Sequence, residues 1–373
     1  MGHLKVNVVM ASISELGNLR QFQFPRQHDY KVLIIDEGDS KLRKRNGDIL
    51  SGVPHEYYGP EERESWFKKR FGGSYKKYLD AIPERCHAET SFGFLVAYEE
   101  NTDVIIELDD DVFPLPYRRA LIDLHLKNLL DKDGETVLAN AKWYNSLENL
   151  ALNNLDLFPR GHPYSIDTRT EDYQWVNNGG ECVLNMGLWL GNPDLDALTI
   201  LYKNGLNGRF TVEGGECKRS KVILGNGVYA AICSMNTAFL TKVVPAFYQL
   251  YMNIMGVDRF DDIWSGIFLK KVADSVGDKI CLGEPAIYHD KRPRNVFKDL
   301  MKELNGMEIN EFLWRMVDEL ELNGSTYWEA YNSLTEGLKK QVATIQTPFH
   351  KKFLQLQVKK MERWLEITDK IKP

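Results

Sequence analysis

The chain has 373 residues, of which 43% are hydrophobic and 27% charged, as in an ordinary globular protein of one large domain with an appendage or of two domains. The formal net charge of −6 argues against a broad nucleic-acid-binding surface, and five cysteines without a CxxC pair argue against a disulfide framework or a zinc ribbon. No apolar run approaches the length of a membrane-spanning helix and the start of the chain has no secretory pattern, so we expect a cytoplasmic protein without a membrane span.

The first third of the chain alternates apolar runs with a helical stretch. We expect strands at residues 4–12, 29–36 and 103–108, and a helix at residues 91–100 that leads into the third of them. This alternation predicts an α/β fold with a mainly parallel central sheet. Ligands of such sheets bind at the carboxyl ends of the strands, and two acidic turns, at residues 36–39 and 109–111, fall at such ends.

The remainder of the chain divides into three regions. A helix is expected at residues 116–130, and residues 142–227, rich in Asn, Gly, Pro and aromatic residues, are expected to form loops and short strands around a site. A helix at residues 261–277 precedes a strand and a basic loop at residues 278–295. From about residue 296 the sequence is helical, so we divide the chain into residues 1–297 and a C-terminal helical extension, residues 298–373.

An apolar stripe in the extension joins Leu354, Val358, Met361 and Leu365. The stripe is typical either of packing against the main domain or of a contact between copies in a homo-oligomer. Packing within the chain is the favoured interpretation.

The triplet Asp109–Asp111 follows an apolar strand directly. In an extended turn Asp109 and Asp111 point to one side and Asp110 to the other, where it is expected to contact a ribose or a backbone group. Carboxylates that converge in this way favour Mn²⁺ or Mg²⁺, which share their remaining positions with phosphate oxygens. This D-x-D pattern is typical of nucleotide-sugar enzymes, although it is short, and a solvated loop that caps the next helix is the alternative.

Three further segments carry candidate ligand groups. Asp36, Glu37 and Asp39 end the second strand and could contact a base and ribose hydroxyls, or form an ordinary turn. His289 could be a third metal ligand. The cations that follow it could bind phosphate oxygens; they are Lys291, Arg292 and Arg294. Arg160 lies between a proline and a glycine, which implies a fixed loop geometry that suits a positioned group.

Several ordered blocks resemble one known family. The blocks are FGFLVAYEENTDVIIELDDDVF, FPRGHPYS, NMGLWLGNPDLDALT, CSMNTAFLTKVVPAFY, DRFDDIWSGIF and AIYHDKRPRNVF, which together span roughly residues 6–298. They are similar to the reversibly glycosylated polypeptides, the UDP-arabinopyranose mutases of glycosyltransferase family 75. The resemblance implies a GT-A-like fold, a divalent metal with UDP held at Asp109–Asp111, and interconversion of UDP-arabinopyranose and UDP-arabinofuranose. It also implies that Arg160 becomes reversibly glycosylated.

Two positions depart from the family pattern. The plant pattern has a second arginine seven residues after the first, where this chain has Asp167, with Arg169 two residues further on; His162 replaces a tyrosine. Both positions lie in the block that handles the sugar, so the resemblance defines the fold more firmly than the sugar.

A mechanism consistent with these residues begins with the attack of Arg160 on the anomeric carbon. Arginine is ordinarily protonated, so a carboxylate must accept its proton, and Asp261 or Asp262 is the candidate by position in the matched block. Two alternatives use the same UDP-sugar site. The first is a glycosyltransferase that passes the sugar to an external acceptor, and the second is a non-catalytic scaffold that binds the nucleotide sugar.

Overall fold

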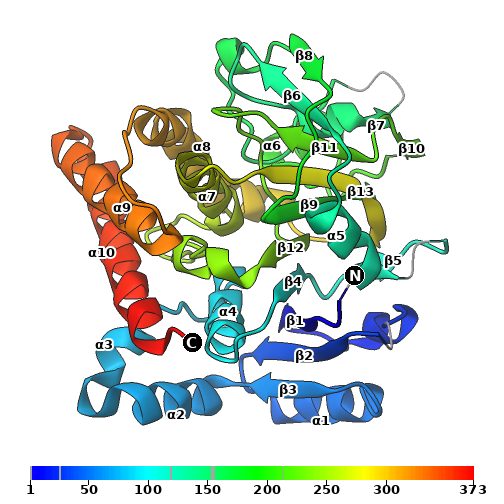
Figure 1. The fold of residues 1–373 in the computed structure, drawn as a ribbon, viewed down its shortest axis with the longest axis vertical. Helices are drawn as coiled ribbons and strands as arrows, with labels where there is room; N and C mark the ends of the chain where they lie inside the picture. Colours follow the sequence, from blue (N-terminus) through cyan, green and yellow to red (C-terminus); the bar gives the residue numbers. More distant parts are fainter. Residues whose placement is uncertain (1, 25–26, 118–119, 153–155, 213) are drawn as a thin grey trace.

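The computed structural model of the protein describes residues 2–24, 27–117, 120–152, 156–212 and 214–373. Within these residues a mixed sheet of 11 strands crosses the molecule in the order β3-β2-β1-β4-β12-β9-β13-β11-β6-β8, with β5 paired to β13 (Figure 1). The strands of this sheet are β1 (Lys5–Ser12), β2 (Asp29–Asp36), β3 (His55–Tyr58), β4 (Val104–Leu108), β5 (Val112–Pro114), β6 (Glu135–Ala139), β8 (Tyr173–Val176), β9 (Leu184–Gly191), β11 (Lys221–Leu224), β12 (Asn236–Leu240) and β13 (Ile280–His289). Two short strands, β7 (Leu150–Leu152) and β10 (Gly214–Cys217), pair apart from it.

The parallel half of the sheet is built from β1 to β4. Strand β1 lies between β2 and β4 and is parallel to both, and β2 is parallel to β3. All five residues of β4 are buried, which accounts for its nearly continuous apolar sequence. Because the strands run the same way, the turns that follow β1, β2 and β4 meet at one edge of the sheet. The predicted α/β class, with most strands in one direction, is confirmed.

The second half of the sheet is mixed. Strand β12 is antiparallel to both β4 and β9, and β9 is parallel to β13. The expectation of loops and short strands for residues 142–227 is correct only in part, because β9 is an eight-residue central strand. The asparagine and glycines of β9 interrupt its apolar pattern, so the sequence does not predict a buried strand here. Asn185 is satisfied by the buried ring of His125, and a side chain at Gly187 would collide with Asn236.

The helices lie on both sides of the sheet. They are α1 (Ser40–Ile49), α2 (Pro60–Phe71), α3 (Tyr75–Leu79), α4 (Thr90–Glu99), α5 (Leu121–Leu130), α6 (Ala197–Tyr202), α7 (Asp261–Val276), α8 (Val296–Asp318), α9 (Tyr327–Thr344) and α10 (Pro348–Ile371). The start of the helix expected at residues 116–130 includes residues 118–119, which lie outside the described residues. In the part of the chain that is described, no helix has the length and apolar character needed to cross a membrane.

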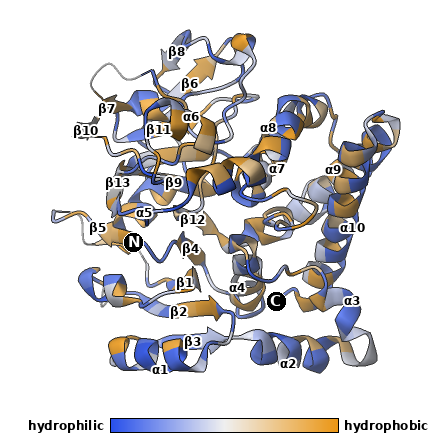
Figure 2. Cartoon of the chain, turned by 180° about the vertical axis from the view of Figure 1, so that it is seen from behind, coloured by the Kyte–Doolittle hydropathy of each residue, from blue (hydrophilic) through white to orange (hydrophobic). Residues whose placement is uncertain are grey.

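The C-terminal helices α8, α9 and α10 pack against the main body rather than extend from it (Figure 1). Leu354, Val358, Met361 and Leu365 of α10 are all buried within the single chain. The other faces of α10 are polar, and hydrophilic and hydrophobic residues both occur along the helix (Figure 2). The boundary predicted at residues 297/298 falls in the first turn of α8.

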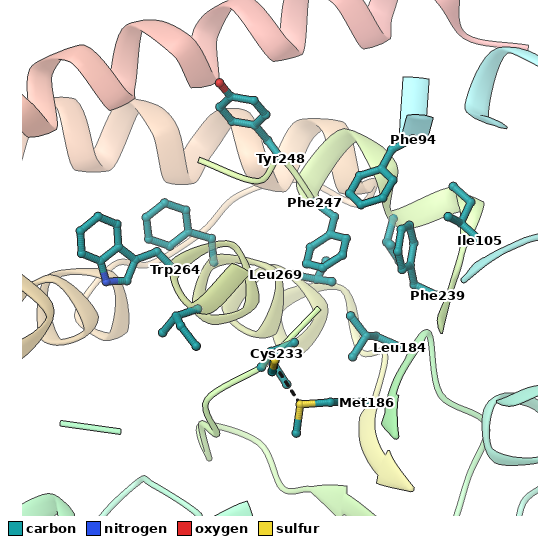
Figure 3. Close-up of a cluster of buried hydrophobic side chains, with 14 of the residues drawn as sticks. Phe94, Ile105, Leu184, Met186, Cys233, Phe239, Phe247, Tyr248, Trp264 and Leu269 are labelled. Carbon is teal, nitrogen blue, oxygen red and sulfur yellow. Dashed lines mark hydrogen bonds between the residues drawn. The ribbon is translucent and has the colours of Figure 1, made fainter. Parts of the chain in front are cut away.

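One continuous apolar core joins the sheet to α4, α7 and the C-terminal helices. Phe94 of α4, Phe239 of β12 and Phe247 pack together, with ring centroids 4.8–5.9 Å apart (Figure 3). On the other side of α7, the backbone N–H of Cys233 donates to the sulfur of Met186 at 3.0 Å. This core holds the carboxyl ends of the central strands in a fixed arrangement.

Candidate active site

A cavity of about 730 Å³ opens at the carboxyl ends of β1, β2 and β4. Its wall is mostly charged, and it collects groups from segments distant in the sequence. Among the lining residues are Ser12, Ile13, Glu37, Arg85, His87, Glu89, Asp109, Asp110, Asp111, Arg160, Asp194, Cys233, Asp258, Arg259, Asp261, Asp262, His289, Lys291, Arg292, Arg294, Asp299 and Lys302. Of the residues predicted from the sequence to form the site, only Asp36 and Asp39 do not line this cavity.

The guanidinium of Arg160 is buried in the cavity wall between two carboxylates. Its Nε and Nη2 donate to the two oxygens of Asp194 at 3.1 and 2.8 Å. Its Nη1 and Nη2 donate to the two oxygens of Asp262 at 3.3 and 3.2 Å, and Nη1 also donates to the main-chain carbonyl of Arg259. All five N–H donors of Arg160 therefore have a partner.

The loop around Arg160 is shaped by Gly161. This glycine has a φ of +89°, and a Cβ at this position would lie 2.3 Å from a methyl group of Ile263, the residue that follows Asp262 in α7. A side chain here would push the loop away from α7. The backbone N–H of Arg160 donates to the carbonyl of Asp194 at 2.8 Å, so backbone and side chain are tied to the same residue.

Arg160 and its two carboxylate partners shift one another's pKa values. Burial disfavours the charged form of Arg160, but the carboxylates of Asp194 and Asp262 outweigh this effect and raise its pKa well above the ordinary value. Burial opposes the ionisation of Asp194 too, yet Arg160 lowers the pKa of Asp194 to about 2. For Asp262 burial prevails and the pKa is raised. Of the two carboxylates, Asp262 is therefore the better proton acceptor.

Asp111 and His289 are brought together by strand pairing. Val112 of β5 pairs with His289 at the end of β13, and this register places Asp111 Oδ1 3.5 Å from Nε2 of His289. Nδ1 of His289 donates to the carbonyl of Asn192 at 2.7 Å, so Nε2 is the ring nitrogen that faces Asp111. A buried carboxylate oxygen beside an imidazole nitrogen suits a divalent cation such as Mn²⁺.

Asp109 and Asp111 contact different partners in the cavity. Oδ1 of Asp109 is buried without a hydrogen bond of good geometry, and its nearest cation is Nε2 of His87 at 3.2 Å. The described residues hold no group of ligand atoms within 4.8 Å of one another that includes Asp109, Asp111 and His289 together. Asp111 and His289 thus form a preassembled pair, whereas Asp109 faces His87 in the same cavity.

His87 is a site residue that the sequence did not reveal. Its Nδ1 lies 3.0 Å from Asp261, and its Nε2 faces both Asp109 and Glu107. Burial opposes its charge, but Asp109 and Asp261 raise the pKa of His87 well above its usual value. The imidazolium therefore joins the acidic turn after β4 to the first turn of α7. The carboxylate of Asp261 contacts His87, whereas that of Asp262 contacts Arg160.

Asp110 is occupied by protein groups. Its carboxylate accepts from the hydroxyl of Ser14 at 2.6 Å, from the backbone N–H of Ile13 at 3.2 Å and from Arg292 at 2.6 Å. Asp110 thus joins the turn after β1 to the basic loop after β13 and leaves Asp109 and Asp111 as the freer carboxylates of the triplet.

The basic loop contributes an unusual lysine. Lys291 is buried in the cavity wall, and burial together with the nearby Arg259 lowers its pKa to about 8. Arg294 lines the same wall, and its backbone is held by the carbonyl of Asn207 at 2.7 Å. Cations that line the cavity together with the carboxylates suit a ligand that carries an anionic group.

The acidic residues of the turn after β2 have different roles. Glu37 lines the cavity, whereas Asp36 accepts from the N–H of Gly38 at 2.8 Å and Asp39 accepts from Lys41 and Leu42 as the N-cap of α1. Glu89, which the sequence did not nominate, lies beside Glu37. Burial, and with it the nearby Glu37, raises the pKa of Glu89 to about 10, which favours the neutral acid.

A second group of metal-ligand types is better explained as an ion pair. Asp194, Cys233 and Asp262 bring ligand atoms within 4.8 Å of one another. However, the guanidinium of Arg160 already binds both carboxylates, and burial raises the pKa of the Cys233 thiol well above its usual value. A neutral thiol is a poor metal ligand, so these residues do not fit a metal in this arrangement.

Fold and site together define an α/β protein whose parallel strands end at a polar cavity suited to an anionic ligand. The model of the family "Reversibly glycosylated polypeptide" matches residues 2–373, and the chain belongs to this family.

Relatives align over nearly the whole chain. The chain is 26% identical to "Probable UDP-arabinopyranose mutase 4" of Arabidopsis thaliana, with 98% of this chain and 92% of that protein covered. It is 27% identical to "Probable UDP-arabinopyranose mutase 1" of Pisum sativum, with the same coverage, and 25% identical to "UDP-arabinopyranose mutase 1" of Arabidopsis thaliana, with 99% and 93% covered. Among solved structures, S. aureus TarS 1–349 in complex with UDP-GlcNAc is 9% identical, with 98% and 91% covered. Its TM-score against this chain is 0.32.

Proposed function

We propose that this protein is a UDP-sugar mutase that interconverts UDP-arabinopyranose and UDP-arabinofuranose through a transient glycosyl-arginine at Arg160. The membership in the reversibly glycosylated polypeptide family supports the reaction class, and the curated relatives carry the name of this activity. The observation that carries the proposal is that Arg160, clamped by Asp194 and Asp262, lines the same cavity as the Asp109–Asp111 turn.

The proposed covalent step needs a change at the Arg160 cluster. A nitrogen of the guanidinium attacks the anomeric carbon, the bond between that carbon and the diphosphate oxygen breaks, and UDP leaves with the bonding electrons. The proton lost by the guanidinium passes to a carboxylate. Asp262 is the better candidate, because it contacts both terminal nitrogens and burial raises its pKa. The tethered sugar opens, closes through another hydroxyl and returns to UDP.

The diphosphate would lie between the acidic turn and the basic loop. Asp111 and His289, with Asp109, would hold a divalent cation, which when bound would neutralise negative charge on the departing diphosphate. Lys291 and Arg294 would contact the phosphate oxygens, and Glu37 would contact the base or the ribose. Arg292 is already paired with Asp110 and would act mainly by ordering the turn.

Incubation with UDP-arabinopyranose and Mn²⁺, without any acceptor, tests this proposal. We expect both ring forms to appear on chromatography, and a pentosyl mass on the peptide that contains Arg160. Arg160→Lys, which keeps the charge and loses the bidentate geometry, should abolish both signals while UDP still binds. If Arg160→Lys kept full activity and full labelling, the covalent role of Arg160 would be wrong.

The same assay separates the two alternatives. A glycosyltransferase for an external acceptor would consume UDP-arabinopyranose only when an acceptor is added, and a binding scaffold would bind UDP with metal but show no turnover.

A further inference from the structure

Helix α8, in the C-terminal extension, makes side-chain contacts with the segments that surround Arg160. Glu303 and Asn310 are completely or almost completely buried, although both are polar residues of a helix. The amide of Asn310 donates to the carbonyl of Gly161 at 2.9 Å and accepts from the indole N–H of Trp264 at 3.0 Å. The Arg160 loop is thus tied to α8 directly beside its reactive residue.

Glu303 binds two segments of the site at once. One carboxylate oxygen accepts from Nε of Arg259 at 2.5 Å, and the other accepts from the backbone N–H of Ala197 at 2.6 Å. Ala197 begins α6, three residues after Asp194, and the main-chain carbonyl of Arg259 accepts from Nη1 of Arg160. Glu303 therefore contacts the segment on each side of the Arg160 guanidinium without touching the guanidinium itself.

The backbone at Arg259 is held in an unfavourable conformation. Its φ is +68°, in the left-handed region, which costs a residue with a side chain roughly 1–2 kcal/mol relative to glycine. Neighbouring bonds hold it there: the N–H of Arg259 donates to Asp258 at 3.0 Å, and Asp258 pairs with Lys302 of α8 at 2.9 Å. Such conformations persist where surrounding contacts over-determine them, and they often mark functional sites.

We infer that Glu303 is a positioning residue for Arg160: by holding the side chain of Arg259, it keeps the Arg259 carbonyl aimed at Nη1 of Arg160. This inference rests on the proposed function in one respect, because it takes Arg160 as the reacting residue. The inference gives the C-terminal extension a role in the reaction at the site. Loss of such positioning can reduce a reaction rate on the order of 10²-fold.

Glu303→Gln tests the role with a change of one charge and almost no change of shape. The amide keeps one acceptor for Ala197 and presents N–H groups to Arg259. We expect the kcat of the mutase to fall on the order of 10²-fold while KM for the UDP-sugar and the affinity for UDP stay within about threefold. Glu308→Gln, on the same helix but with an exposed side chain paired only to His350, is the matched control and should behave as wild type.

A pair of variants at Arg259 keeps the inference testable if Glu303→Gln folds poorly. Glycine adopts the left-handed conformation freely and alanine does not, so in a chain that keeps Glu303, Arg259→Gly should turn over roughly tenfold faster than Arg259→Ala. If the aim of the Arg259 carbonyl had no part in the reaction, the two variants would have equal rates, and this result would overturn the inference.

A chemical readout separates this inference from the proposed function. We expect 2,3-butanedione to modify Arg160 roughly tenfold faster in Glu303→Gln than in wild type, because one charge-assisted hydrogen bond to the guanidinium is lost. If wild type has no mutase activity but the modification rates differ, only the proposed function fails. If wild type is active and neither kcat nor modification changes in Glu303→Gln, only the positioning role fails.

Discussion

Arg160 and Asp194 form a buried bidentate ion pair, with Nε–Oδ1 and Nη2–Oδ2 distances of 3.1 and 2.8 Å. Both side chains are almost completely buried, and the backbones of the two residues are hydrogen-bonded as well. Neither charge has enough water around it to be stable alone, so each depends on the other. A site that uses this arginine as a nucleophile must therefore loosen a strong contact before the reaction.

Asp194→Asn should disrupt this pair and leave Arg160 with Asp262 alone. We expect a loss of about 3 kcal/mol in the free energy of unfolding, measured by urea denaturation, because one partner of a buried ion pair is removed. Labelling of Arg160 should fall on the order of 10²-fold as the guanidinium loses its orientation. Asp196→Asn, at the N-cap of α6 outside the cavity, is the control, and it should cost less than about 1 kcal/mol since asparagine also caps helices.

Asp111→Asn should weaken the binding of Mn²⁺ at least about tenfold, measured by electron paramagnetic resonance of free Mn²⁺, because it removes the charged oxygen beside His289. Metal-dependent UDP binding should weaken in parallel. Asp290→Asn changes an adjacent carboxylate that pairs with Arg209 and does not line the cavity, and it should leave Mn²⁺ binding unchanged. If Asp111→Asn bound Mn²⁺ with unchanged affinity, the triplet would be a structural turn and not a metal site.

Lys291→Met should weaken the binding of UDP by roughly 10- to 100-fold in isothermal titration calorimetry, the expected loss for a charge-assisted hydrogen bond to phosphate. Uridine has no phosphate, so its weaker binding should be the same in wild type and variant. Equal losses for UDP and uridine would indicate that the substitution has disturbed the pocket rather than a phosphate contact.

Glu89→Gln should make stability less dependent on pH. Burial raises the pKa of Glu89 to about 10 in the folded chain, against an ordinary value of 4.5, so between these values the folded state holds a proton that the unfolded state has lost. The stability contributed by this proton is complete below about pH 4.5 and declines as the pH rises toward 10. Glutamine cannot ionise, so the variant lacks this dependence on pH.

The difference in the free energy of unfolding between Glu89→Gln and wild type should therefore move in favour of the variant by on the order of 1 kcal/mol per pH unit between pH 5 and 9. Urea denaturation at pH 5, 7 and 9 measures it. Glu308→Gln, with an exposed side chain, should show no such trend. A difference that stays constant with pH would mean that Glu89 is ionised in the folded protein.

Much of the fold could be predicted because its signals are local. The apolar run of β4 and the acidic residues after it are adjacent in the chain, and the parallel strands β1, β2 and β4 place their turns at one edge of the sheet. Strand β9 was missed because its polar residues are satisfied by distant partners: Asn185 by His125 and Cys281, which only the folded sheet brings near.

The sequence by itself determined the α/β class, the position of the acidic triplet, the helical C-terminus and the family blocks that contain Arg160, since each depends on residues that are close in the chain. Only the tertiary structure decided which carboxylates contact Arg160, that His87 joins Asp109 to Asp261, and that Glu303 reaches Arg259. These contacts depend on strand register and helix packing between segments 22 to 174 residues apart, and such long-range geometry leaves no periodic pattern in a single sequence.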